Sequence, residues 1–196
     1  MLKKLILALS LMAFGGAALA VDTTALPKKK QTQLGLYLES KDAYHLVKKN
    51  DSNTLFVDVR SRAEVNFLGM PTVADANIPY MSLSEFYTFD AKKKNFKMEL
   101  NDGFLDAVKE RLVSKGLNKD SKIIFICRSG SRSAAAANLM AKAGFKNVYT
   151  VVDGYEGDKV KVGKAKGQRI VNGWKNNGLP WSYKLHASKM YASDEI

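Results

Sequence analysis

Short apolar runs alternate with amphipathic stretches between residues 34 and 152, and this alternation predicts a layered fold. Three runs are short and mostly apolar, as expected for strands that are buried on both faces: 55–59, 122–126 and 148–152. Three stretches carry apolar residues at helical spacing or are rich in alanine: 41–49, 101–115 and 133–143. Glycine follows the last two, at Gly116 and Gly144, as is typical of helix ends.

Weaker patterns complete this outline. Alternation over residues 34–38 predicts a further short strand, and residues 61–67 predict one or two helical turns. Residues 70–80 read as a loop with a short extended piece. The order strand, helix, strand, helix, strand predicts an α/β fold with a mainly parallel sheet, right-handed crossovers and covering helices.

The two ends of the chain read differently from this region. Residues 1–20 combine Lys3 and Lys4, an apolar run and a small-residue site at Ala18–Ala20, which predicts a signal peptide cleaved after Ala20. We therefore expect an exported protein, periplasmic in a bacterium, with no stable membrane anchor after cleavage. Residues 21–33 predict a polar linker, and 186–196 a C-terminal tail.

Composition narrows the chemistry. The chain has 31 Lys and Arg against 19 Asp and Glu, a net charge of +12, which admits nucleic acid, an anionic membrane surface or a small anionic substrate. One cysteine excludes an internal disulfide, and with two histidines it argues against Cys/His metal sites, so we expect no metal or organic cofactor. The Lys-rich stretches lack a nucleic-acid-binding signature, and we expect no nucleic acid partner.

The one cysteine lies where an α/β fold places chemistry. Cys127 follows the run 122–126 directly and starts the loop Cys127-Arg128-Ser129-Gly130-Ser131-Arg132-Ser133, which leads into the Ala-rich helix. Ligands bind beyond the carboxyl ends of parallel strands, and backbone N–H groups at a helix start attract anions. We expect these dipoles and the two Arg residues to favour a Cys127 thiolate beside a bound oxyanion, an arrangement for covalent catalysis.

The loop resembles the active-site loop of single-domain rhodaneses of the exported bacterial type. Other family motifs are matched in order: Asp58-Val59-Arg60 with Glu64, Ala76-Asn77-Ile78-Pro79, Asp153-Gly154-Tyr155-Glu156-Gly157 and Gly173-Trp174-Lys175-Asn176-Asn177-Gly178-Leu179-Pro180. The resemblance covers residues 34–185 and implies an open, mainly parallel sheet of about five strands with helices on both faces. Three departures are visible: residues 69–75, directly before Ala76, contain no His, residues 158–172 split the last motif, and residues 84–100 form a long basic insertion.

The resemblance implies a sulfurtransferase. Cys127 would take sulfane sulfur from a small anionic donor such as thiosulfate, hold it as a persulfide and pass it to cyanide, a thiol or a protein acceptor. Arg128, Arg132 and the loop residues Ser129, Gly130, Ser131 and Ser133 would bind the donor, while Asp58 and Arg60 would act mainly as supports. Arg128 can alternatively face solvent, and Arg132 can alternatively hold the loop through internal hydrogen bonds.

Two other classes stay open. A rhodanese-like domain can also serve as a persulfide carrier or docking module with little turnover of its own. A Cys-dependent phosphatase or arsenate reductase is less compatible, because four residues separate Cys127 from Arg132 where the related phosphatases have five, and because no resolving thiol exists.

Overall fold

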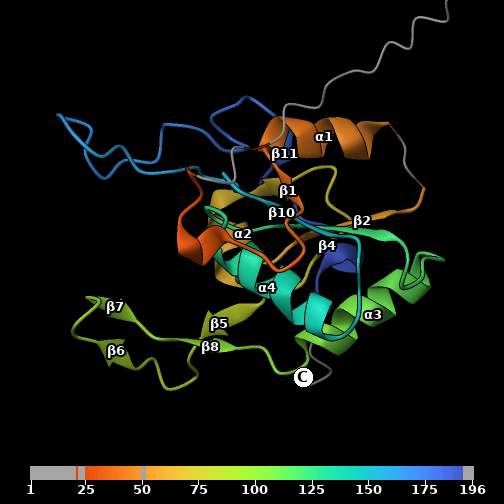
Figure 1. The fold of residues 1–196 in the computed structure, drawn as a ribbon. Coiled ribbons are helices and arrows are strands. Elements are labelled where there is room, and N and C mark those ends of the chain that lie inside the picture. Colours follow the sequence, from red (N-terminus) through yellow and green to blue (C-terminus); the bar gives the residue numbers. More distant parts are fainter. Residues whose placement is uncertain (1–20, 22–24, 50–51, 192–196) are drawn as a thin grey trace, which may run out of the picture.

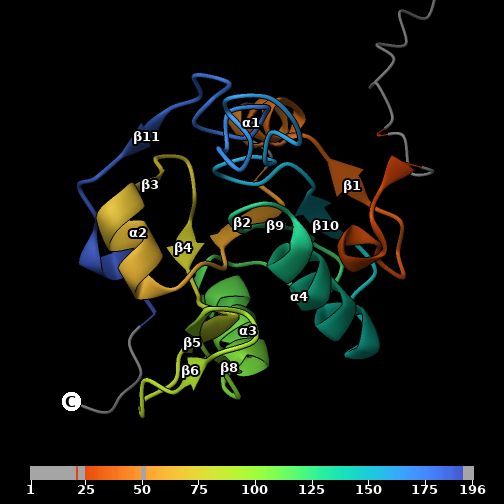
Figure 2. The same ribbon diagram turned by 90° about the vertical axis from the view of Figure 1, so that its left-hand side faces the viewer.

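The computed structural model describes residues 21, 25–49 and 52–191, so the predicted signal peptide lies outside the described residues. The predicted α/β fold is confirmed. Its main sheet has five strands, all parallel, in the order β1-β10-β9-β2-β4 (Figure 1; β9 is labelled in Figure 2). In this order the strands are Tyr37–Leu38 (β1), Val148–Val151 (β10), Lys122–Ile126 (β9), Thr54–Asp58 (β2) and Ala76–Asn77 (β4).

Among the described residues, four α-helices cover both faces of this sheet (Figure 2). They are Ser40–Lys48 (α1), Arg62–Leu68 (α2), Phe104–Ser114 (α3) and Ser131–Lys142 (α4). Alternate residues of a strand point to opposite faces, so each strand contributes to two cores. Val57 and Phe125 pack with α3 and α4, whereas Phe56 and Ile124 pack with α1 and α2.

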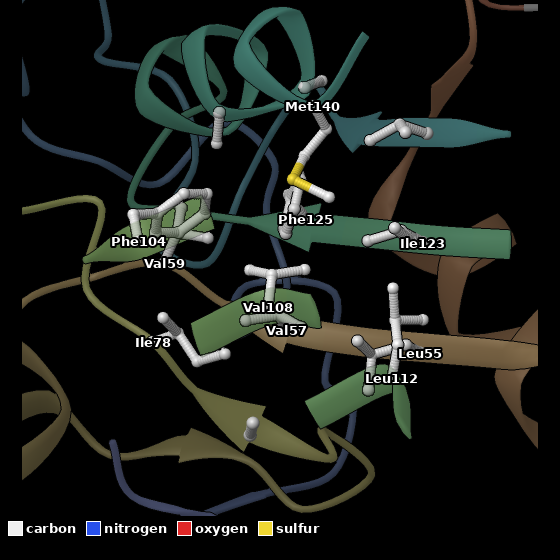
Figure 3. Packing of buried hydrophobic residues seen from close by; sticks show 14 of the residues in the cluster. Leu55, Val57, Val59, Ile78, Phe104, Val108, Leu112, Ile123, Phe125 and Met140 are labelled. Carbon is white, nitrogen blue, oxygen red and sulfur yellow. The ribbon is translucent and has the colours of Figure 1, made fainter. Parts of the chain in front are cut away.

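The core under α3 and α4 is shown in Figure 3. Phe125 of the central strand lies between Met140 of α4 and Phe104 of α3, and the Phe104 and Phe125 rings are 5.7 Å apart at their centroids. These side chains are all fully buried. The central strand β9 is therefore fixed on both edges and on both faces, and so is the point where it ends at Cys127.

Several short strands were not predicted individually. Strand β4 lies inside residues 70–80, where a loop with a short extended piece was predicted, and forms one edge of the sheet beside β2. Residues 81–100, which include the basic insertion 84–100, form two antiparallel ribbons: Met81–Leu83 (β5) with Met98–Leu100 (β8), and Phe89–Asp90 (β6) with Asn95–Phe96 (β7). A third small pair joins Met70–Pro71 (β3) to Trp181–Ser182 (β11).

The segment expected as a polar linker is attached to the domain. Lys28–Lys30 form a short 3-10 helix, η2, that contacts α4. Lys30 is buried, and its Nζ donates hydrogen bonds to the Val152 carbonyl and to the Asp158 carboxylate, both at 2.8 Å. Part of the segment that the sequence predicted as a polar linker is thus bonded to the domain, because the Lys30 ammonium group has two acceptors there.

The start of the expected tail is attached as well. Ala187–Lys189 form a second 3-10 helix, η3, beside β4. Arg111 donates a hydrogen bond to the Ser188 carbonyl, and the Tyr191 N–H donates one to the Asn77 carbonyl. Within the described residues, no helix has the length and apolar character that a bilayer crossing requires.

Candidate active site

The Cys127 thiol lies at the carboxyl end of the central strand, enclosed by its own loop. Its side chain is 1% exposed. The Gly130 N–H donates a hydrogen bond to Sγ at 3.2 Å, and the Ser133 hydroxyl lies 3.5 Å from Sγ. The sequence predicted that this loop would direct N–H groups at the cysteine, and the Gly130 amide does so.

A second buried hydroxyl supports this arrangement. Thr150 of β10 donates from Oγ1 to the Ser133 oxygen at 2.7 Å, and the Ser133 hydroxyl also lies 3.2 Å from the Gly130 carbonyl. Both side chains are fully buried. No sequence pattern pointed to Thr150, because its contact with Ser133 depends on the pairing of β10 with β9.

Gly130 is the last loop residue before helix α4. Its φ is +92°, a left-handed conformation that glycine adopts without steric cost. A Cβ at this position would lie 2.2 Å from the Val152 carbonyl oxygen. The loop therefore turns back into the helix only because residue 130 has no side chain.

Arg132 is engaged by a carboxylate from another helix. Its Nη1 and Nη2 lie 2.6 and 2.5 Å from the two Glu64 carboxylate oxygens. Burial alone would raise the pKa of Glu64, but the bidentate Arg132 and the Ser61 N–H outweigh it and lower that pKa to about 2. The same Ser61 and Glu64 form the capping box of α2. Arg132 thus ties the loop to α2, through a carboxylate that lies outside the loop.

Asp58 and Arg60 form a fully buried ion pair at the end of β2. The Arg60 Nη2 lies 2.6 Å from the Asp58 carboxylate and also donates to the Gly69 carbonyl, while the guanidinium stacks 3.7 Å above the Tyr155 ring. Burial alone would lower the pKa of Arg60, but the Asp58 carboxylate outweighs it and raises that pKa. These contacts join β2 to the start of β3 and to Tyr155, and they agree with a supporting position beside the loop.

The remaining predicted residues lie at the rim. Arg128 is exposed and forms no ion pair with any described residue, while Ser129 and Ser131 are half-buried. Alongside them runs the segment 154–156: the Tyr155 N–H donates to the Cys127 carbonyl at 2.8 Å and the Glu156 N–H donates to the Arg128 carbonyl at 3.0 Å. One side of the loop is therefore lined by the first half of the split motif.

The two halves of that motif are rejoined in space. The Trp174 N–H donates to the Gly154 carbonyl and the Lys175 N–H to the Tyr155 carbonyl. The buried Asp153 accepts hydrogen bonds from the Ser40 and Gly173 N–H groups, although burial still raises its pKa. Residues 158–172 thus leave and return at one point, as a hairpin whose Lys159 and Arg169 form an antiparallel bridge.

Both insertions lie on the side of the molecule where the loop meets α4. In Figure 1 the 158–172 hairpin and the β6–β7 ribbon project from this side, and in Figure 2 they lie above and below the start of α4. Among the described residues, no group of three or more His, Cys, Asp or Glu side chains is arranged to hold a metal ion.

The chain is similar in sequence to known proteins. The sequence profile of the rhodanese-like domain matches residues 41–161. The protein RP600 of Rickettsia prowazekii is 34% identical over 145 residues, which are 74% of this chain and 94% of the relative. The thiosulfate:glutathione sulfurtransferase of Saccharomyces cerevisiae is 28% identical over 106 residues, 54% of this chain and 65% of that enzyme.

A solved structure is also similar to this chain. The crystal structure of Rv0390 from M. tuberculosis superposes with a TM-score of 0.52 at 27% identity, covering 76% of this chain and 97% of that one.

Proposed function

The chain belongs to the rhodanese-like domain family, and we propose from this premise that it transfers sulfane sulfur through a persulfide on Cys127. The donor is a small anion such as thiosulfate, and the acceptor is a nucleophile such as cyanide or a thiol. The observation that carries the proposal is the hydrogen bond from the Gly130 N–H to the Cys127 Sγ, at the carboxyl end of the central strand. Such a donor stabilises negative charge on sulfur, as the thiolate and the persulfide both require.

The reaction has two balanced halves. The Cys127 thiolate attacks the outer sulfur of thiosulfate, a new S–S bond forms at Sγ, and the old S–S bond breaks with its electron pair leaving on sulfite. Cyanide or a thiolate then attacks the outer persulfide sulfur, which leaves as thiocyanate or as a new persulfide, and the Cys127 thiolate returns.

Burial of the thiol favours this chemistry over phosphate transfer. Because the Cys127 side chain is 1% exposed, the reacting atom of the donor must enter the loop alone. The terminal sulfur of thiosulfate can do so, whereas the phosphorus of a phosphoester is surrounded by four oxygens. The short spacing of four residues between Cys127 and Arg132 also favours sulfur transfer over phosphate transfer.

Intact-mass measurement tests the proposal. The purified protein is reduced and treated with thiosulfate, and its intact mass is measured by mass spectrometry. The Cys127→Ser variant is treated in parallel. We expect a gain of one sulfur atom in the wild type only, and its loss with formation of thiocyanate when cyanide is added. No added sulfur, or equal addition to the Cys127→Ser variant, would contradict the proposal.

The same assay separates turnover from sulfur carriage. A stable persulfide with thiocyanate formation near background would identify a carrier or docking module in place of an enzyme. Hydrolysis of p-nitrophenyl phosphate dependent on Cys127 would instead identify a phosphatase.

We further propose that the protein acts after export. The pattern in residues 1–20 supports this, and cleavage after Ala20 would give a mature chain that starts at Val21. The intact mass of protein recovered from the periplasm of a bacterial host tests it. A mass equal to the full chain would exclude cleavage.

A further inference from the structure

We propose that Arg169, on the inserted hairpin, is a donor-binding residue that acts with Arg128 on the charged end of the sulfur donor. This inference rests on the proposed function and adds to it a residue from outside the active-site loop. It also gives the 158–172 hairpin a role, the selection of doubly charged oxyanion donors.

The hairpin stands on the segment that lines the loop. Tyr155 and Glu156 donate their N–H groups to the Cys127 and Arg128 carbonyls, and Gly157 is the next residue. A Cβ at Gly157 would lie 1.7 Å from the Asn172 carbonyl oxygen, so the two ends of the hairpin are in direct contact there. The base of the hairpin is thus fixed directly beside the backbone that pairs with the loop.

Arg169 is held at this base. Its Nη1 donates to the Gly157 carbonyl at 2.5 Å, and its own carbonyl accepts a hydrogen bond from the Asn176 amide at 3.0 Å. The side chain is half-buried. A guanidinium has five N–H donors, so one hydrogen bond positions the group and leaves four for a ligand.

The Arg169 guanidinium interacts electrostatically with charged groups of the active site. Burial and the positive charge of Arg128 lower the pKa of Arg169, while the negative charges of Glu156, Asp158 and a Cys127 thiolate act in the opposite direction. Asp158 is already engaged by Lys30 at 2.8 Å. Arg169 itself forms no ion pair with any described residue.

Arg132, which the sequence proposed for donor binding, is occupied by Glu64. Arg128 alone would then oppose the two negative charges of a donor such as thiosulfate. Two guanidinium groups near each other repel in the empty site, and a bound dianion relieves that repulsion. A neutral or singly charged donor relieves less of it, so the pair favours doubly charged donors.

Two donors of different charge test this inference. Thiosulfate carries two negative charges and methanethiosulfonate carries one, and each offers a terminal sulfur to Cys127. For Arg169→Ala we expect the KM for thiosulfate to rise by about tenfold, the size typical of one charge-assisted contact, with a rise below about threefold for methanethiosulfonate. Arg169→Lys keeps the charge and should recover part of the affinity.

Lys164→Ala is the matched control. Lys164 is exposed on the same hairpin, and its replacement removes the same charge. We expect its KM for both donors to stay within about twofold of wild type, since exposed charges contribute little individually. An equal loss with both donors in Arg169→Ala would mean that Arg169 only holds the hairpin, and an unchanged KM for thiosulfate would overturn the inference outright.

The outcomes distinguish this inference from the proposed function. If the wild type gains no sulfur from either donor, the persulfide mechanism fails. If the wild type gains sulfur and Arg169→Ala binds thiosulfate equally well, only the role of Arg169 fails.

Discussion

Among single residues, Gly130 is the one that most tightly constrains the conformation of the loop. Replacement by Ala adds a Cβ that would lie 2.2 Å from the Val152 carbonyl oxygen, in a left-handed conformation. We expect Gly130→Ala to lower the free energy of unfolding by more than about 2 kcal/mol and to abolish sulfur transfer, because the loop must move. Denaturant unfolding and the thiosulfate assay measure the two effects.

Gly116→Ala separates the conformational cost from the clash. Gly116 ends α3 at a φ of +70°, and a Cβ added there would have no other group within 4 Å. We expect Gly116→Ala to lower the free energy of unfolding by about 1 kcal/mol and to leave sulfur transfer unchanged. If the two variants lost equal stability, close packing of Gly130 against Val152 would not be the constraint.

Thr150 belongs to the site although it is remote from the loop in sequence. Thr150→Val keeps the shape of the side chain and removes the hydrogen bond to Ser133. We expect persulfide formation to slow by about threefold to tenfold, which corresponds to one hydrogen bond of about 1 kcal/mol, because Ser133 is no longer fixed beside Cys127. Stopped-flow or quenched intact-mass kinetics measure the rate.

Thr54→Val is the matched control for this change. Thr54 is buried in β2, and its hydroxyl has no hydrogen-bond partner among the residues that the structure describes. Its removal should leave the rate unchanged and leave stability equal or slightly higher. A similar slowing in both variants would mean that the loss of any buried hydroxyl perturbs the site.

At the scale of elements, sequence pattern predicted the unit that carries the chemistry. The apolar run 122–126 and the Ala-rich stretch before Gly144 identified β9 and α4, and the loop between them identified Cys127. Helix α4 begins two residues earlier than expected, at Ser131, because the left-handed Gly130 precedes it. Long periodic elements can be recognised from the sequence in this way because each buries a continuous face.

Most of the shorter strands could not be located from the sequence, although the short strand near residue 37 was predicted. Strand β4 has two residues, and its place is fixed by pairing with β2 and by the Asn77 amide, which donates to the Asp58 and Arg60 carbonyls. Two residues cannot display a period of two. The β5–β8 ribbons were missed for a similar reason, since each strand has two or three residues and most are exposed.

Lys30 supplies the buried side-chain contacts that help to attach the N-terminal segment to the domain. Lys30→Ala removes hydrogen bonds to the Val152 carbonyl and to Asp158. We expect a loss of about 1–2 kcal/mol in unfolding free energy, moderated because the Asp158 side chain remains 42% exposed to water. Lys29→Ala, at an exposed neighbour, should cost close to nothing, and chemical denaturation of both variants decides between them.

For the molecule as a whole, the contacts that complete the site join distant parts of the chain. Arg132 and Glu64 are 68 residues apart, and Thr150 and Ser133 are 17 apart. Sequence motifs named Glu64 and Arg132 separately, yet their pairing depends on how α2 and α4 meet at the end of the sheet. The same holds for Arg169, which is held beside the segment lining the loop only because the split motif is rejoined at Gly173.

The Glu64–Arg132 pair makes the stability of the whole domain depend on pH. The pKa of Glu64 falls from 4.5 to about 2 on folding, so the unfolded chain binds this proton more readily than the native one. The stabilisation is therefore complete above about pH 5 and is lost as the pH falls toward about 2. Acid should weaken the wild type over this range.

Glu64→Gln isolates this contribution. The variant has no carboxylate to protonate, so its unfolding free energy should lie below that of wild type at about pH 6, and the difference should shrink toward acid. Burial raises the pKa of Asp153, which acts in the opposite direction, but Asp153 is common to both proteins and cancels in the difference. Urea unfolding of both proteins across this range measures it. A difference that stayed constant with pH would show that Glu64 stabilises the domain by packing or hydrogen bonding alone, because only the loss of an ionised pair follows the proton.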